Sequence, residues 1–172
     1  METKIELGLL GGQLSHSFSK IMHEAALESL NIQGRYWLWE IPPGKNMAQN
    51  LASKINEIRR GEVRGVNVTI PYKERVIPYL DRLTLTAKQI GAVNTIYWDQ
   101  AEQKVIGGNT DAPAFWQDIQ PILPGKLAAP QGLVLGAGGA ARAVCHELMK
   151  HGWKVIVAAR RTFQAQKLSR DL

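Results

Sequence analysis

Short apolar runs alternate with amphipathic stretches along the first 120 residues. An apolar run rich in β-branched residues is typical of a buried strand, whereas apolar residues at every third or fourth position are typical of a helix. This pattern predicts strands at Ile5–Leu10, Tyr36–Ile41, Val66–Ile70, Ala92–Trp98 and Lys104–Gly107, and helices at Ser17–Leu30, Asn46–Ile58, Lys73–Tyr79, near Leu83–Ile90 and at Asp111–Ile119. Strands and helices in this order predict an α/β domain over residues 1–120.

Three prolines then interrupt the pattern and predict a linker over residues 121–130. Beyond it, an apolar run at Leu133–Leu135 leads through a glycine-rich turn into the helix-like stretch Arg142–Met149. A second apolar run follows at Lys154–Ala159. A strand, a turn, a helix and a strand in this order predict the start of a Rossmann domain over residues 131–172.

The glycine-rich turn carries the clearest chemical signal. In a βα unit of this kind Gly136 can form the tight turn, and Gly138 lets the backbone approach a pyrophosphate. The small side chain of Ala141 permits close packing of helix on sheet, and the free N–H groups at the helix start attract an anion. We therefore predict a nucleotide site, the alternative being a plain tight turn, at Gly136, Ala137, Gly138, Gly139, Ala140 and Ala141.

The residues after the second apolar run indicate which nucleotide is bound. An NAD-selective fold places Asp or Glu about 20 residues beyond the glycines, where it binds the ribose hydroxyls. Here the chain has Arg160 and Arg161. Two guanidinium groups can bind a 2′-phosphate by charge-assisted hydrogen bonds, which predicts NADP. In the alternative interpretation both arginines are solvated residues at the end of a strand.

Composition narrows the class of protein. The chain has 172 residues, of which 45% are hydrophobic, enough for a sizeable core. It has no apolar run of about 20 residues and no signal-like N-terminus, so we expect a cytoplasmic protein without a membrane span. The single cysteine, Cys145, falls within a predicted helix, where a buried structural thiol is expected.

The chain is basic, with 21 Lys and Arg against 15 Asp and Glu and a net charge of +6. A nucleic-acid binder is therefore one alternative, but the charges are dispersed, without an arginine-rich tract, zinc-finger spacing or aromatic RNA-binding pattern. A modest positive field suits anionic small molecules equally well. We expect a small-molecule substrate, no nucleic-acid partner and no metal.

Four polar segments lie at predicted strand ends or turns, where α/β sheets present their ligand-binding groups. They offer hydroxyls, carboxamides, an ammonium and a carboxylate, a set suited to a polyhydroxylated ring. Each also has a structural interpretation, because Ser17 and Asp111 could be helix N-caps and Asn94 a turn residue. The segments are Ser15–Ser19, Asn67–Lys73, Gly91–Thr95 and Gly107–Asp111.

Together with the glycine turn, these segments resemble the shikimate dehydrogenase family. The resemblance covers essentially the whole chain and rests on Val66–Lys73, Gly91–Thr95, Asn109–Asp111 and Gly136–Ala141, in order and spacing. The family consists of NADP-dependent enzymes that reduce 3-dehydroshikimate to shikimate during aromatic amino-acid biosynthesis. The resemblance implies an N-terminal substrate domain, a C-terminal Rossmann domain and an active site between them.

The resemblance also implies roles for individual residues. Lys73 and Asp111 would form the catalytic pair, with the lysine as acid/base and the aspartate holding it and binding the same hydroxyl. Both would also contact substrate. The hydroxyls and carboxylate of shikimate would be bound by Ser17, Ser19, Asn67, Thr69 and Asn94. His16 and His23 are rival acid/base candidates, but neither has a spaced set of Cys, Asp or Glu ligands.

Several positions depart from the usual family pattern. Gln13 and Lys20 stand where the family commonly has proline, Glu24 where it has asparagine, and Ala114 where it has glycine. At the cofactor end, Ala159 replaces the usual asparagine, so contacts to adenosine are less secure than contacts to phosphate.

The predicted nucleotide domain contains only two strands, whereas a complete dinucleotide fold has about six. From this we expect a fragment, a shortened expression product or a truncated gene product that binds shikimate but turns it over poorly. An open sheet edge could pair with another copy in a homodimer. The alternatives are a catalytically silent shikimate-binding fragment and a quinate/shikimate dehydrogenase of wider range.

Overall fold

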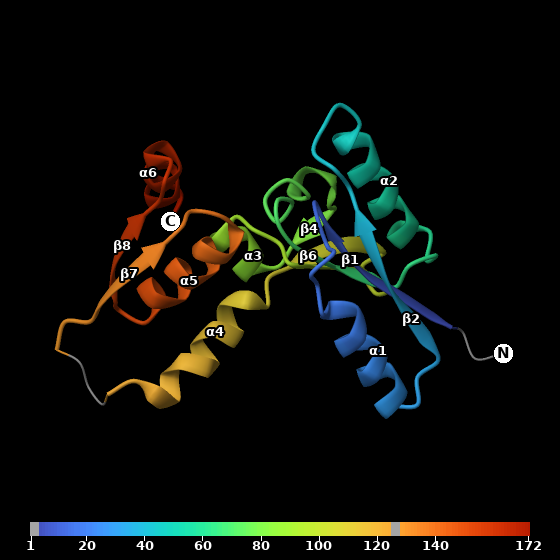
Figure 1. The fold of residues 1–172 in the computed structure, drawn as a ribbon, viewed down its shortest axis with the longest axis horizontal. Coiled ribbons are helices and arrows are strands. Elements are labelled where there is room, and N and C mark those ends of the chain that lie inside the picture. Colours follow the sequence, from blue (N-terminus) through green and yellow to red (C-terminus); the bar gives the residue numbers. More distant parts are fainter. Residues whose placement is uncertain (1–3, 125–127) are drawn as a thin grey trace. The chain divides into compact units, whose positions relative to one another are not determined.

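The computed structural model describes residues 4–124 and 128–172 (Figure 1). Contacts between Cα atoms divide the chain into two compact units. The first unit comprises Met1–Thr84 and Val93–Gly108, and the second comprises Leu85–Ala92 and Asn109–Leu172. The chain therefore enters the second unit at Leu85, returns to the first at Val93, and enters the second again at Asn109.

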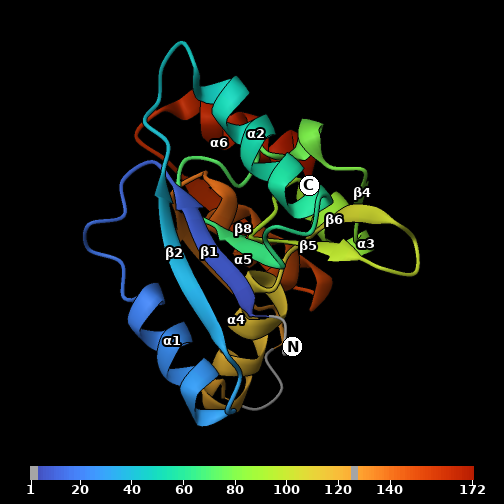
Figure 2. The same ribbon diagram turned by 90° about the vertical axis from the view of Figure 1, so that its right-hand side faces the viewer.

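A six-stranded sheet forms the first unit, in the order β2-β1-β3-β5-β6-β4. β1 runs parallel to β2, beside which it lies in Figure 2, and to β3. β5 is antiparallel to β3 and β6, and β4 is parallel to β6. The carboxyl ends of five strands and the amino end of β5 therefore lie at one end of the sheet, which is called the sheet edge below. The strands are β1 (Ile5–Gly11), β2 (Gly34–Glu40), β3 (Gly65–Val68), β4 (Arg82–Leu83), β5 (Thr95–Asp99) and β6 (Lys104–Gly108).

Two helices of the first unit, α1 (Ser19–Ser29) and α2 (Met47–Arg59), follow the predicted amphipathic pattern. α2 buries Leu51, Ile55 and Ile58, which are spaced to lie on one helix face. α1 buries Leu27 close to Gly34 of β2, where a Cβ atom would lie 3.1 Å from the leucine side chain. Burial of these apolar faces supplies the main stabilisation of the unit.

Two predicted helices of the first 92 residues are wrong in part. The stretch expected to be helical over Lys73–Tyr79 consists of turns and one short 3₁₀ helix, Ile77–Tyr79. Pro78 lacks the N–H that a longer α-helix would need there. The stretch near Leu83–Ile90 splits into β4 and α3 (Leu85–Ile90), because Arg82 and Leu83 pair with β6.

The second unit contains a parallel strand pair, β7 and β8, with helices packed around it. Its core includes one cluster of Val134, Cys145, Leu148 and Leu168 and a second of Ile90, Ala92, Ala112 and Ala143. The strand–helix–strand unit predicted from the glycine turn is confirmed. A final helix was not predicted, because Leu168 is its only buried residue. The elements are α3, α4 (Asp111–Ile119), a 3₁₀ turn (Gln120–Ile122), β7 (Gln131–Leu135), α5 (Gly139–Lys150), β8 (Lys154–Ala158) and α6 (Thr162–Asp171).

The compact units divide the chain at other residues than the predicted domains do. α4 belongs to the second unit by its contacts, although the predicted substrate domain extends to residue 120. The predicted linker, residues 121–130, includes residues 125–127, which lie outside the described part of the chain. The functional boundary near residue 120 stays a prediction.

Cys145 is a buried structural thiol, as predicted. Its side chain lies in the core of the second unit and is 1% exposed. Burial raises the pKa of the thiol, because the thiolate would lose its hydration. A nucleophilic cysteine needs the opposite shift.

A buried arginine connects three helices of the second unit. Arg142 of α5 is 4% exposed and donates a hydrogen bond of 3.1 Å to the carbonyl of Ile90, at the end of α3. Its guanidinium also forms an ion pair with Asp171, at the end of α6. The hydrogen bond and charge of Arg142 lower the pKa of Asp171 below its ordinary value of 3.8. The pair therefore stabilises the unit while Asp171 is ionised.

We expect Asp171→Asn to lower the free energy of unfolding at pH 7 by about 1 kcal/mol, a value discounted for the solvent exposure of Asp171. Because the folded-state pKa is lowered, the stabilisation is present above the ordinary pKa and is lost as the pH falls through the folded-state pKa. Denaturant unfolding at pH 7 and at low pH measures this difference. Asp118→Asn, at an exposed position of α4, is the control. An equal loss at both pH values would contradict the assignment.

Candidate active site

The loop after β1 is fixed to the ends of the two neighbouring strands. The N–H of Gly12 donates to the Ile70 carbonyl at 2.9 Å, just beyond β3. The N–H of Leu14 donates to Glu40 Oε1 at 2.6 Å, at the end of β2, and the N–H of Ile41 donates to the Gly11 carbonyl at 2.9 Å. These bonds hold the segment that carries Ser17 and Ser19 at the end of the sheet where β1, β2 and β3 finish.

A cavity of about 370 Å³ opens at this edge. Three hydroxyl side chains predicted to bind substrate, those of Ser17, Ser19 and Thr69, line it together. Gly11 leaves room for this arrangement, because a Cβ atom there would lie 2.6 Å from the Thr69 side chain. His16, considered in the sequence analysis only as a rival acid/base, also lines the cavity, and the sequence interpretation missed the other lining residues, which are Leu9, Gln13 and Leu14.

Phe18 holds the N-cap position of α1, so Ser17 is not the N-cap proposed as its structural alternative, although it makes a local contact. α1 begins at Ser19, and the Ser19 N–H donates a hydrogen bond of 3.2 Å to Ser17 Oγ. A serine hydroxyl has one proton to donate and two acceptor positions. This contact uses one acceptor position, so binding of a ligand by the Ser17 proton is compatible with it.

Lys73 and Asn94 lie at the same edge as Thr69. The backbone carbonyl of Lys73 accepts a hydrogen bond of 2.7 Å from the Val93 N–H. The backbone of Asn94 connects two strand ends, because its carbonyl accepts from Val68 at 2.8 Å and its N–H donates to Gly108 at 3.0 Å. The Asn94 side chain is buried and accepts a hydrogen bond from the Thr95 hydroxyl at 3.0 Å. Sheet pairing thus brings together segments that are distant in sequence.

Asn67 is placed differently from the other candidates of this unit. It lies within β3 and lines a separate cavity of about 290 Å³ on a face of the sheet. Its Oδ1 accepts a hydrogen bond of 2.8 Å from the hydroxyl of Tyr36 on β2. The structure therefore does not place Asn67 in the lining of the cavity that contains Ser17.

Asp111 is the first residue of α4, in the second unit. Asn109, two residues before the start of α4, caps the helix, because its Oδ1 accepts a hydrogen bond of 3.2 Å from the Ala112 N–H. Asn109 Nδ2 donates to the Ala92 carbonyl at 3.0 Å. Asn109 thus supplies a side-chain cap of α4. The Asp111 carboxylate lies in the first turn, where the helix dipole favours a negative charge.

The glycine turn has the backbone geometry expected of a nucleotide loop. Gly136 has a φ of 120°, a conformation that favours glycine, and its N–H donates to the Ala158 carbonyl at 2.7 Å. A Cβ atom on Gly138 would meet open space. No side chain of the described residues caps α5 at Gly138, so its first N–H groups are suited to an anion. Ala141 packs on the core of the unit, as expected.

Arg160 and Arg161 are exposed and lie directly after β8. β7 and β8 are parallel, with Leu135 paired to Ala158, so the arginines and the glycine turn follow neighbouring strand ends. The carbonyl of Arg161 accepts a hydrogen bond of 2.9 Å from Gln164 in the first turn of α6. The backbone of both arginines thus lies at the same end of the strand pair as the glycine turn.

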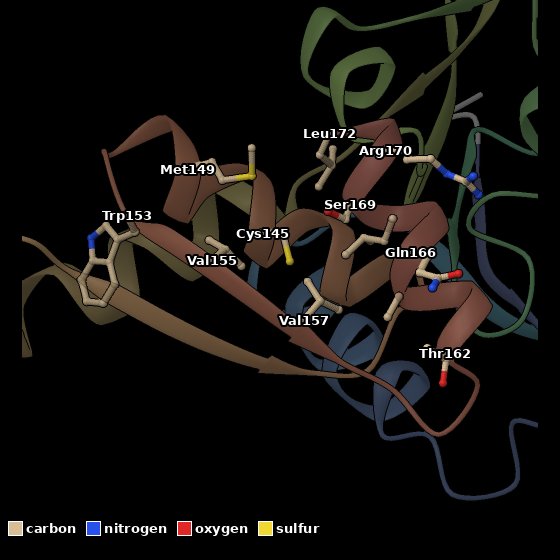
Figure 3. A pocket seen from close by; sticks show the side chains of 12 residues that line it. Cys145, Met149, Trp153, Val155, Val157, Thr162, Gln166, Ser169, Arg170 and Leu172 are labelled. Atoms are coloured by element: carbon tan, nitrogen blue, oxygen red, sulfur yellow. The ribbon is translucent and has the colours of Figure 1, made fainter.

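A larger cavity of about 870 Å³ lies among α5, β8 and α6 (Figure 3). Its lining mixes apolar side chains, among them Cys145, Val155 and Val157, with polar ones, and it contains none of the predicted site residues. Its size alone therefore does not make it the nucleotide site, which needs backbone N–H groups and cations.

The described residues contain neither a metal-ligand cluster nor a membrane-spanning helix. Within residues 4–124 and 128–172, no group of three or more His, Cys, Asp or Glu side chains could hold a metal ion. No helix in the same residues is long and apolar enough to cross a membrane.

Comparisons with known proteins agree with this arrangement. Residues 9–96 match the family model described as the shikimate dehydrogenase substrate binding domain. The shikimate dehydrogenase (NADP(+)) of Carboxydothermus hydrogenoformans is 40% identical over 170 residues, which are 99% of this chain and 58% of that protein. The chain belongs to the shikimate dehydrogenase family, and it spans less than two thirds of the length of this relative.

Solved structures show the same fold. The shikimate 5-dehydrogenase of Thermus thermophilus, in complex with NADP(H) and shikimate, has a TM-score of 0.80 and 40% identity. The match covers 97% of this chain and 60% of that one. The quinate dehydrogenase of Corynebacterium glutamicum, in complex with NAD, has a TM-score of 0.83 and 33% identity, over 98% of this chain and 60% of that one.

Proposed function

We propose that this chain provides the substrate site and part of the cofactor site of an NADP-dependent shikimate dehydrogenase. The reaction is the reversible reduction of 3-dehydroshikimate to shikimate. The observation that carries this proposal is the cavity lined by Ser17, Ser19 and Thr69 at the sheet edge that also bears Lys73 and Asn94.

The cavity suits a small ring that carries hydroxyls and a carboxylate. Its polar groups include the hydroxyls of Ser17, Ser19 and Thr69, which can donate to a carboxylate and exchange hydrogen bonds with ring hydroxyls, and the side chains of Gln13 and His16. Leu9 and Leu14 supply an apolar surface for the carbon ring. Asn94 adds a buried carboxamide at the same edge, and Asn67 is assigned to substrate binding through the family pattern.

Lys73 is assigned the proton transfer. Its ammonium would stabilise the alkoxide that develops at the ring carbonyl and donate the proton to that oxygen. Asp111 would orient the ammonium and bind the same hydroxyl. The nicotinamide of NADPH, when bound, supplies the hydride. The presence of both residues favours an enzyme over a silent binding module.

The cofactor is assigned to the edge formed by the glycine turn and the end of β8. The N–H groups at the start of α5 would bind the pyrophosphate, and Arg160 and Arg161 would bind the 2′-phosphate of NADP. The adenosine end of the cofactor therefore has its main partners in the second unit.

A second candidate is quinate as an additional substrate, supported by the similarity to a quinate dehydrogenase. Calorimetric titration of the purified chain with shikimate, quinate, NADP and NAD, one at a time, distinguishes the candidates. We expect saturable binding of shikimate and NADP and weaker binding of quinate and NAD. Tighter binding of quinate than of shikimate would favour the second candidate, and no binding of either acid would reject both.

Self-association of the chain is also a proposal. Leu133, Leu135 and Ile156 of β7 and β8 are exposed and give this strand pair an apolar surface. Such a surface favours pairing with a second copy. Sedimentation of the purified chain over a range of concentrations tests for a homodimer.

A further inference from the structure

Tyr36 connects two candidate substrate residues. It lies on β2 with 2% of its surface exposed, and its hydroxyl donates a hydrogen bond of 2.8 Å to Asn67 Oδ1 on β3. β1 lies between these strands, and it pairs Leu7 with Tyr36 and Leu9 with Asn67. Residues two apart on a strand share a face, so Tyr36 and Asn67 lie on the same face of the sheet.

The ring of Tyr36 is connected to the start of α1. His23 stacks on it, with ring centroids 4.2 Å apart and an angle of 17° between the planes. His23 Nδ1 also lies 2.8 Å from the Ser19 carbonyl. A carbonyl can only accept, so Nδ1 carries the proton in this contact. The helix turn that bears Ser19 is thus held against Tyr36 through His23.

The Tyr36 hydroxyl remains a hydrogen-bond donor at neutral pH. Burial raises the pKa of Tyr36 to about 12, and a hydrogen bond with the Ser19 side chain opposes this rise. The hydroxyl has one proton, which it gives to Asn67 Oδ1. This hydrogen bond therefore fixes the orientation of the Asn67 carboxamide, whose two N–H donors point away from the Tyr36 hydroxyl.

We propose that Tyr36 is a positioning residue for substrate binding: its hydroxyl fixes the Asn67 side chain, and its ring, through His23, holds the helix turn that bears Ser19, in the orientations that bind shikimate. This inference rests on the proposed function and deepens it. Tyr36 and Asn67 line a separate cavity from the one that contains Ser17, Ser19 and Thr69, so the effect of Tyr36 on shikimate is exerted through Asn67 and through the helix turn that bears Ser19.

The test is Tyr36→Phe in the whole chain, with shikimate affinity measured by calorimetry. Phenylalanine keeps the ring that stacks on His23 and removes only the hydroxyl. We expect shikimate affinity to fall roughly tenfold, the usual scale for a lost hydrogen bond in a buried network, while NADP affinity stays unchanged. The control is Tyr97→Phe, the same change on β5 at a residue that lines the cavity of Asn67 but is 36% exposed.

A ligand-free measurement separates this inference from the proposed function. In ¹⁵N NMR spectra, Tyr36→Phe should shift the side-chain NH₂ signals of Asn67, and Tyr97→Phe should leave them nearly unchanged. Unshifted Asn67 signals in Tyr36→Phe would overturn the inference, as would unchanged shikimate affinity. If the unmodified chain bound no shikimate, the proposed function would fail, and the role assigned to Tyr36 would fail with it even if the Asn67 signals moved.

Discussion

Replacing Lys73 with alanine is expected to lower the turnover of shikimate by roughly 10² to 10⁴, the usual range for loss of a positioned acid/base. Substrate affinity should change much less, because the hydroxyls of Ser17, Ser19 and Thr69 remain. The measurement is kcat and KM for shikimate in an active protein that contains this chain. Normal turnover by Lys73→Ala would remove the lysine from the mechanism.

The partner of Lys73 is tested by Asp111→Asn, which keeps the shape of the side chain and removes its charge. This change should impair both turnover and recognition of the substrate hydroxyl. If the two residues act as one unit, the double variant should lose far less than the product of the two single effects. Multiplicative losses would show that they act independently.

Replacing Arg160 and Arg161 together with alanine is expected to weaken NADP binding by roughly 2 to 4 kcal/mol, as for lost charge-assisted hydrogen bonds to a phosphate. NAD lacks the 2′-phosphate, so its affinity should stay nearly unchanged. Titration of the variant with both cofactors measures the difference.

The control for this prediction is Lys154→Ala, which removes a positive charge from the opposite end of β8. It should lower the affinity for either cofactor only slightly, through a weaker long-range electrostatic attraction. Equal losses of NAD and NADP in the double arginine variant would reject the assignment of these residues to the 2′-phosphate.

Local signals in the sequence predicted much of the fold. α4 begins and ends where expected, because Asn109 caps it and Pro113 fits the first helical turn. The glycine turn likewise predicted β7, α5 and β8, because residues close to it in sequence determine its backbone conformation. Elements specified by nearby residues are the ones that a sequence indicates most directly.

Other features depend on contacts between distant segments. β4 has only two residues and exists because it pairs with β6, more than twenty positions away in sequence. α6 has a single buried apolar residue, so its periodicity gave no clear pattern. In both cases tertiary packing determines a structure that local preference leaves open.

The candidate site shows the same division. Ser17, Ser19 and Thr69 were predicted from motifs, and the structure places them around one cavity. Tyr36 gave no signal of its own, because an aromatic residue in an apolar strand is usually part of the core. Its connection to Asn67 spans 31 positions and becomes visible only once β1 has brought β2 and β3 into register.

The central claim is that shikimate binds in the cavity at the edge of the first unit. Its most direct test is a titration of the ¹⁵N-labelled chain with shikimate, followed through the backbone amide signals. The largest shifts are expected at Ser17, Ser19, Thr69 and Asn94. Shifts confined to residues around the larger cavity of α5, β8 and α6, or no shifts at saturating shikimate, would contradict it.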